Sequence, residues 1–262
     1  MYTELPRPIL FAHRGASLYA PENTLAAFEL ALRQGAAAVE LDVKLTADGQ
    51  MVVIHDQTVD RTTDGKGWVK DLSLAEIRKL DAGSHFDISF QGEPVPTLEE
   101  VLKAVGQLTF TNIELTNYAS TTDDLPEKAA ALVKRLKLTR RVIFSSFNPI
   151  ALRRVKRALP EVPVGLLALP GGRGMLVRGW IGRLLVRYQT LNPERSDVTP
   201  KLVERLHRQE REVLTYTVNE RAEMERLFRA GIDGIFTDDP PLALQVRSEI
   251  ESQRSPSQSL RR

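Results

Sequence analysis

The most informative segment of the chain covers residues 37–56 and reads AAVELDVKLTADGQMVVIHD. Its first part predicts a buried β-strand over 37–43, and a turn containing Asp-Gly separates that strand from a second apolar run at 51–55. A parallel crossover needs about a dozen residues, so the second run is expected to return antiparallel to the first, as a hairpin. The hairpin would bring His55 back opposite Asp42.

Short apolar runs alternate with longer amphipathic segments along the rest of the chain. Besides 37–43, strands are expected at 9–12, 110–115, 142–144, 164–169, 188–191, 213–218 and 232–236. Helices are expected at 24–33 (with Asn23 as N-cap), 75–80, 125–138, 149–158, 201–209, 221–230 and 241–250. This alternation predicts a parallel sheet. Eight strands favour an α/β fold of the TIM (β/α)₈ barrel type, which takes roughly 250 residues, over an open doubly wound sheet.

Two segments depart from this alternation. Residues 58–96 are rich in Asp, Gly and Ser, and we expect them to form a small insertion that caps one end of the barrel. Residues 251–262 are rich in Ser, Gln and Arg, and we expect a disordered tail there. The remaining 1–250 are expected to form one domain.

The composition excludes several classes of function. The chain of 262 residues contains 36 basic and 34 acidic residues, so its formal net charge of +2 gives no reason to expect a nucleic-acid partner. It contains no cysteine, which excludes disulfides, cysteine-ligated zinc, iron–sulfur clusters and thiol catalysis. No apolar run reaches the ~18 residues of a membrane-spanning helix, and no secretory signal is visible. The expected location is the cytoplasm.

Charged side chains occupy the ends of several strands that are otherwise buried. Glu40 and Asp42 are two residues apart on one strand, so they point to the same face, and Glu114 ends the neighbouring strand. Three carboxylates without a thiol suit a hard cation, Mg²⁺ or Ca²⁺. In the alternative interpretation, the three carboxylates form salt bridges with Arg14, Lys44 or Lys70.

The four histidines divide into two pairs. His13 and His55 stand at the ends of adjacent elements beside the carboxylates, and imidazole is well suited to proton transfer near neutral pH. We therefore expect one to act as a base and the other as an acid. His85 lies in the insertion and His207 on a charged helix, so both are expected to be solvated. The glycine-rich run at 171–174 lacks the features of a phosphate-binding loop and is expected to be a flexible turn.

The polar residues at the strand ends belong to short motifs. These include His13-Arg14-Gly15, Pro21-Glu22-Asn23-Thr24, Glu40-Leu41-Asp42-Val43, Val52-Val53-Ile54-His55-Asp56, Asn112-Ile113-Glu114, and Gly231-Ile232-Asp233-Gly234 with Thr237-Asp238. Through these motifs, which extend from about residue 9 to about residue 240, the sequence resembles the glycerophosphodiester phosphodiesterase family. The resemblance implies a TIM barrel, a divalent ion held by the three carboxylates, and the first pair of histidines as general acid and base.

The resemblance also implies a substrate site. Arg14 would contact the substrate phosphate, and Glu22 and Asn23 would help to build the site. The chain departs from the family at two positions. The family commonly has a lysine two residues after the third carboxylate, where this chain has Thr116, and Tyr216 stands where the family commonly has tryptophan. Both residues are expected to contact substrate.

By the same resemblance, the expected reaction is hydrolysis of a glycerophosphodiester to glycerol 3-phosphate and an alcohol. An alternative is lysophospholipase D-like or C-like hydrolysis of lysophospholipids at a membrane surface, because Thr116 lacks the charge of a lysine. Residues 173–187 mix arginines with apolar side chains, which indicates either peripheral contact with lipid or an ordinary barrel helix. The third alternative is a non-catalytic binding protein, against which the intact set of histidines and carboxylates argues.

Overall fold

The computed structural model describes residues 4–118, 120 and 122–254, except for the side chains of residues 177, 180, 183 and 254. The strands are β1 (Ile9–Ala12), β2 (Ala38–Leu45), β3 (Met51–Val53), β4 (Phe110–Leu115), β5 (Val142–Ser146), β6 (Val164–Ala168), β7 (Thr190–Pro193), β8 (Glu212–Thr215) and β9 (Gly234–Thr237). The α-helices are α1 (Leu25–Arg33), α2 (Leu74–Ile77), α3 (Leu98–Val105), α4 (Leu125–Arg135), α5 (Pro149–Ala158), α6 (Gly171–Arg178), α7 (Trp180–Leu185), α8 (Pro200–His207), α9 (Arg221–Arg229) and α10 (Pro240–Arg254).

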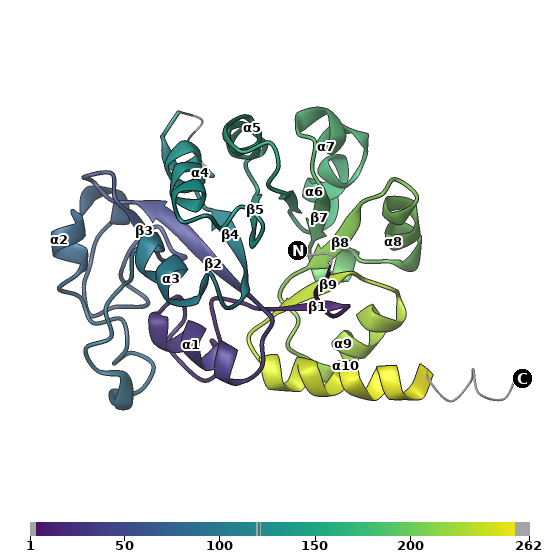
Figure 1. Cartoon of the computed structure of the whole chain (residues 1–262), viewed down its shortest axis with the longest axis horizontal. Helices are drawn as coiled ribbons and strands as arrows, with labels where there is room; N and C mark the ends of the chain where they lie inside the picture. Colours follow the sequence, from purple (N-terminus) through teal and green to yellow (C-terminus); the bar gives the residue numbers. More distant parts are fainter. Residues whose placement is uncertain (1–3, 119, 121, 255–262) are drawn as a thin grey trace, which may run out of the picture.

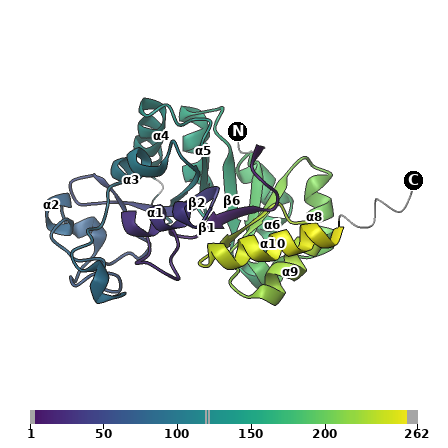
Figure 2. The same cartoon turned by 60° about the horizontal axis from the view of Figure 1, so that its bottom comes forward.

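Eight parallel strands close into a barrel. Their order is β1, β9, β8, β7, β6, β5, β4 and β2, and β1 pairs with β2 to complete the ring. Helices surround the strands (Figure 1), and α10 packs beside α9 and β1, as the turned view also shows (Figure 2). The predicted TIM barrel is confirmed.

Side chains along each strand alternate between the barrel interior and the surrounding helices. The floor of the interior is apolar and consists of Ile9, Phe11, Ala38, Phe110, Ile143, Leu214 and Phe236. Val39, Leu41 and Val43 point the other way and belong to the core between strands and helices. Interior positions two and four residues beyond Ala38 are therefore Glu40 and Asp42, and the polar residues gather above the apolar floor, toward the carboxyl ends of the strands.

The hairpin predicted after β2 is present. Strand β3 pairs antiparallel with β2, with Met51 opposite Leu45, and the Ile54 backbone N–H donates to the Asp42 carbonyl at 3.0 Å. His55 consequently follows at the level of Leu41 and Asp42. The insertion packs against this hairpin through a second apolar core, made of Val52, Ile54, Val59, Val69, Ile77, Ala82 and Val95. It lies around α2 at the left of Figure 1.

Three local expectations were wrong or incomplete. Helix α3 was missed, although Thr97 and Glu100 form a capping box and an apolar stripe follows them. Residues 171–174 are not a flexible turn, because they begin α6. The N-cap of α1 is Thr24, whose hydroxyl accepts from the Ala27 N–H, whereas Asn23 adopts φ +59° and turns its side chain toward β2.

The element ends also shift by a few residues. The strand expected at 188–191 is β7 at Thr190–Pro193, and the strand expected at 213–218 ends at Thr215. Helix α10 continues to Arg254, and the rest of the expected tail, 255–262, lies outside the described residues.

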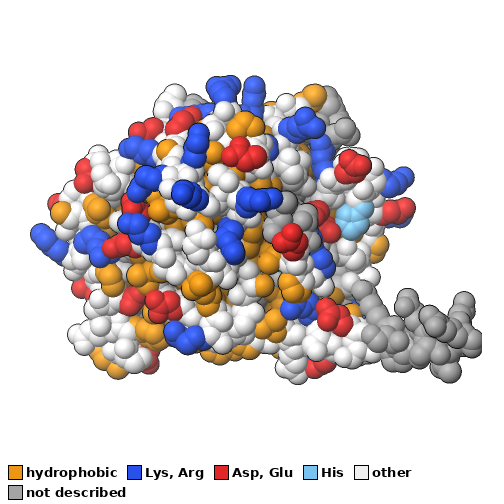
Figure 3. Space-filling model, in the orientation of Figure 1, with side chains coloured by type: hydrophobic (Ala, Val, Ile, Leu, Met, Phe, Trp, Pro, Cys, Tyr) orange, Lys and Arg blue, Asp and Glu red, His pale blue; other side chains and the backbone are white. Residues whose placement is uncertain are grey.

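The outer surface carries mixed charge. Lys and Arg side chains gather over the upper part of the face in Figure 3, where α4 and α5 lie in Figure 1. Among the described residues, no helix has the length and apolar character needed to cross a bilayer.

Candidate active site

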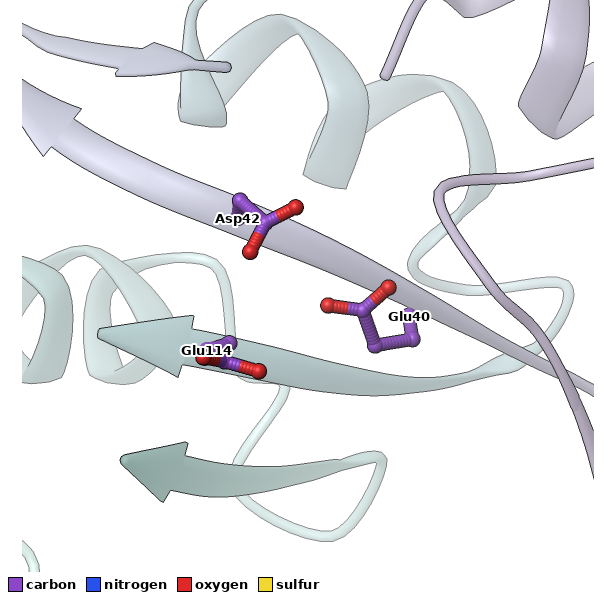
Figure 4. Close-up of side chains that lie close together, drawn as sticks. All are labelled: Glu40, Asp42 and Glu114. Atoms are coloured by element: carbon purple, nitrogen blue, oxygen red, sulfur yellow. The ribbon is translucent and has the colours of Figure 1, made fainter. Parts of the chain in front are cut away.

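Three carboxylates meet inside the barrel near the carboxyl ends of two adjacent strands (Figure 4). Glu40 and Asp42 project from β2 and Glu114 from β4, and Asp42 lies beside Glu114 in the parallel register. One oxygen from each carboxylate lies within 4.8 Å of the others. The tertiary structure thus brings together the three residues for which the sequence predicted a metal site.

Burial and mutual repulsion raise the free energy of these carboxylates in their ionised form when no cation is bound. Glu40 is 2% exposed and Asp42 1% exposed. Burial, together with the nearby charges of Asp42 and Glu114, raises the pKa of Glu40 well above its ordinary value. Burial and the charge of Asp42 likewise raise the pKa of Glu114 to about 8. Glu40 Oε1 is buried and has no hydrogen-bond donor among the described residues.

Arg14 is the cation that contacts this cluster. Its backbone N–H donates to Glu40 Oε2 at 2.9 Å, and its Nε lies 3.3 Å from Asp42 Oδ2. One guanidinium cannot balance the buried Glu40 and Asp42 together with the half-buried Glu114, so the salt-bridge interpretation explains only part of the cluster. The oxygen-only donor set, with two of its three carboxylates buried, and the unpaired Glu40 Oε1 fit a hard divalent cation.

The loop after β1 adopts an unusual backbone that places these contacts. Arg14 and Asn23 have φ values of +56° and +59°, in the left-handed region. Gly15 between them has φ +87°, and a Cβ there would approach the Ala27 carbonyl carbon to 2.6 Å. Asn23 Nδ2 donates to Asp42 Oδ2 at 2.9 Å, so this residue orients a carboxylate of the cluster.

His13 is held by a carboxylate on the far side of its ring. Its Nδ1 lies 2.7 Å from Asp238 Oδ1, which follows β9, and its Nε2 lies 4.0 Å from Glu40 Oε2. Burial alone would raise the pKa of Asp238, but hydrogen bonds from His13, Asn219 and Ser17 lower it to about 2. The ionised Asp238 therefore fixes a proton on Nδ1 and leaves Nε2 directed toward the carboxylates.

His55 has the same kind of support. Its Nδ1 lies 2.7 Å from Asp56 Oδ1. Arg61 donates to both oxygens of Asp56 and to both oxygens of Glu22, and hydrogen bonds from Arg61 are the main cause of the lowered pKa of Asp56. Glu22 also accepts from Arg14 Nη1 at 2.9 Å. A chain of ion pairs through Asp56, Arg61 and Glu22 thus connects His55 to the Arg14 guanidinium.

A cavity of about 240 Å³ lies over this cluster. One wall is polar, formed by both histidines, Arg14 and the three carboxylates, and the other carries Tyr118, Phe147, Leu167 and Tyr216. The Phe147 ring packs edge-on against Tyr118 and Tyr216, at 5.5 Å and 6.0 Å between ring centroids. One wall of the cavity is therefore charged, and the other is mainly aromatic and apolar.

The residues expected to bind substrate occupy three different places. Arg14 and Tyr216 line the cavity. The Tyr216 hydroxyl donates to the Ala168 carbonyl, so the ring of Tyr216, rather than its hydroxyl, is available to contact a substrate. Glu22 and Asn23 lie behind the cavity and hold other site residues. Thr116 lies in a neighbouring cavity, where its hydroxyl donates to the Val43 carbonyl at 2.7 Å.

Three residues that contact the site residues were assigned no role from the sequence. Asp238 and Asp56 orient the histidines, and Tyr118 donates a hydrogen bond to Glu114 Oε1. The two aspartates stood in the quoted motifs, and a carboxylate directly following His55 was the available signal. His207 and His85 are exposed, as expected, although His207 Nε2 also pairs with Asp233.

Comparison with protein families gives a match over residues 13–242 to the model of the glycerophosphoryl diester phosphodiesterase family. Among relatives, the chain is 44% identical over 241 residues to a glycerophosphodiester phosphodiesterase of Caldanaerobacter subterraneus, covering 92% of this chain and 98% of that one. It is 34% identical to a glycerophosphodiester phosphodiesterase of Bacillus subtilis, covering 92% and 87% of the two chains.

Solved structures agree with this match. An Oleispira antarctica phosphodiesterase, solved in complex with the product sn-glycerol-3-phosphate, superposes with a TM-score of 0.80 at 33% identity, covering 94% of this chain and 98% of that one. A glycerophosphodiester phosphodiesterase from Agrobacterium tumefaciens gives a TM-score of 0.77 at 32% identity, covering 89% and 97%.

Proposed function

The chain belongs to the glycerophosphoryl diester phosphodiesterase family, and we propose that it hydrolyses glycerophosphodiesters to glycerol 3-phosphate and an alcohol, with a divalent cation and two histidines. The observation that carries this proposal is the meeting of His13, His55 and the three-carboxylate cluster in one cavity. Each histidine is held at Nδ1 by an aspartate, so each has Nε2 available for proton transfer.

Glu40, Asp42 and Glu114 would hold the cation, Mg²⁺ or Ca²⁺. When bound, the cation neutralises the charge that makes a phosphodiester anion resist attack. Arg14 lines the same cavity and adds a permanent positive charge for a non-bridging phosphate oxygen. Its ion pair with Glu22 and its contact with Asp42 hold the guanidinium in position. The hydrogen bond from Asn23 Nδ2 likewise holds the Asp42 carboxylate in position.

The two imidazoles divide the proton transfers. One accepts the proton of the nucleophile at Nε2, and the other donates a proton to the departing alkoxide oxygen. The nucleophile is either the glycerol hydroxyl next to the phosphate, which gives a cyclic phosphate that water then opens, or water itself. Both routes use the same pair of imidazoles and end at the same products.

The direct test is release of glycerol 3-phosphate from glycerophosphocholine by the purified protein. We expect turnover with Mg²⁺ or Ca²⁺, none with chelator, and recovery when the ion is restored. Asp42→Asn is expected to abolish turnover at every ion concentration, whereas the exposed Glu161→Gln keeps it. Full turnover in chelator would contradict the metal role, and no glycerol 3-phosphate with any cation would contradict the reaction.

The segment at 173–187 supports a second, weaker proposal, peripheral contact with lipid. The exposed fractions of Met175, Leu176 and Leu184 are 63%, 59% and 72%. Arg178 forms a salt bridge with Asp197, with 2.7 Å between Nη1 and Oδ2. Exposed apolar side chains beside arginines favour an interfacial surface. Co-sedimentation with anionic vesicles is expected to fall in Leu176→Glu. Absence of vesicle binding by the wild type would rule out lipid contact through this segment.

A further inference from the structure

A second cavity adjoins the one above the acidic cluster. It has a volume of about 310 Å³ and lies between the start of the hairpin and the loop after β4. Tyr118 lines both cavities, so its ring forms the boundary between them. Its lining combines apolar side chains, such as Leu45 and Val69, with polar ones that include Lys44, Lys70 and Thr116.

Lys44 is the unusual member of this lining. It is the next interior residue of β2 after Asp42, and it is only 5% exposed. Its Nζ donates to Thr116 Oγ1 at 2.7 Å, which is its one hydrogen-bond acceptor among the described residues. Nζ also lies 5.9 Å from the centroid of the Tyr118 ring. The charges of Asp42, Glu114 and Asp56 act on this ammonium from a distance, but among the described residues no carboxylate forms a direct ion pair with it. A buried ammonium normally has such a direct partner.

The cavity has a positive balance. Lys70 reaches its rim with Nζ 5.3 Å from the centroid of the half-exposed Trp68 ring. Asp123 is the one carboxylate in the lining, and its Oδ1 already accepts from Asn117 Nδ2 and from the Leu125 N–H at the start of α4. Two lysines therefore face the cavity while its carboxylate is engaged with the protein.

We propose that this second cavity is the subsite for the leaving alcohol and that Lys44, assisted by Lys70, selects alcohols carrying an anionic group, a phosphate or a carboxylate. The inference rests on the proposed phosphodiesterase function. The smaller cavity, with its aromatic wall, takes the scissile phosphate and the three-carbon glycerol common to all substrates. The variable alcohol extends past Tyr118, and its anionic group forms the direct ion pair that Lys44 does not make within the described part of the chain.

Three substrates that differ in the charge of the leaving alcohol test this inference. They are glycerophosphocholine (cationic), glycerophosphoglycerol (neutral) and glycerophosphoglycerol phosphate (anionic). For the wild type, kcat/KM is expected to rise in that order. In Lys44→Met, the ratio of kcat/KM for the anionic to that for the cationic substrate is expected to fall about 10- to 100-fold, as for loss of one charge-assisted hydrogen bond. Lys44→Arg is expected to restore much of the ratio.

Two further variants complete the design. Lys70→Met, at an exposed position, is expected to lower the same ratio by a smaller factor, so the inference remains testable if Lys44→Met does not fold. Lys134→Met, on the outer face of α4, is the matched control and is expected to keep the wild-type ratio.

The outcomes separate this inference from the proposed function. If the wild type cleaves none of the three substrates with any divalent cation, the proposed function fails. If the wild type cleaves them all without preference for anionic alcohols, only the subsite assignment fails. If Lys44→Met lowers kcat/KM equally for all three, Lys44 serves the scissile phosphate and the selection role is overturned.

Discussion

Neutralising one carboxylate of the acidic cluster is expected to have opposite effects on stability with and without a divalent cation. The perturbation is Glu114→Gln, which keeps the shape of the side chain and an oxygen that can still accept from Tyr118. At an effective dielectric constant of about 20, two unit charges 4.8 Å apart repel by roughly 3 kcal/mol. The substitution removes two such repulsions, with Glu40 and with Asp42.

Part of that repulsion is already relieved by protonation in the wild type. The pKa of Glu114 is raised to about 8 in the folded protein, from an ordinary value of 4.5. Because the folded state holds this proton more tightly than the unfolded state, the group's contribution is fully present below pH 4.5 and is lost as the pH rises through 8. In chelator at pH 7, we therefore expect Glu114→Gln to be more stable by about 1–3 kcal/mol, with a Tm roughly 3–8 °C higher.

Saturation with Mg²⁺ or Ca²⁺ should reverse the order of stability, so that the wild type becomes more stable than Glu114→Gln. A cation at a hundred times its dissociation constant stabilises the folded state by about 2.7 kcal/mol. The wild type gains this stabilisation, whereas the variant, which has lost one coordinating carboxylate, largely does not. Thermal unfolding followed by circular dichroism, in chelator and in each cation across pH 5–9, measures both effects. Glu161→Gln, at an exposed position, is the control. A wild-type Tm indifferent to both cations, or a variant less stable than wild type in chelator at every pH, would refute the reasoning.

Three further predictions concern single side chains. His13→Ala and His55→Ala should each lower kcat/KM for glycerophosphocholine by about 10²–10⁴-fold without changing the circular dichroism spectrum, whereas the exposed His207→Ala keeps activity; near-normal turnover in both site variants would remove the acid/base assignment. Asp238→Asn should lower kcat by roughly 10–100-fold and displace the pH–rate profile, because the amide no longer fixes the proton on Nδ1; a uniform loss with an unchanged profile would indicate a structural role only. Thr24→Ala should cost about 1 kcal/mol of unfolding free energy through loss of the α1 N-cap, measured by urea titration, and an unchanged midpoint would contradict the cap.

Much of the fold followed from local pattern. The hairpin was predictable because the turn after Leu45 is too short for a crossover, which leaves antiparallel pairing as the remaining solution. The missed helix α3 carried a recognisable signal in Thr97 and Glu100. The boundaries of β7 and β8 did not follow, because where a strand ends depends on pairing with neighbours that are remote in sequence.

The amino-acid sequence by itself determined the parallel arrangement of strands, through their alternation with helices, and favoured a closed barrel. It also placed Glu40 and Asp42 on one face, through the two-residue period of a strand. Only the tertiary structure decided which side chains remote in sequence contact one another around the site. Asp238 reaches His13 because β9 lies beside β1, and Lys44 finds Thr116 across the β2–β4 pairing. Such contacts join residues that are 225 and 72 positions apart. Local propensity carries no information over those separations, and closure of the barrel is what sets the distances between them.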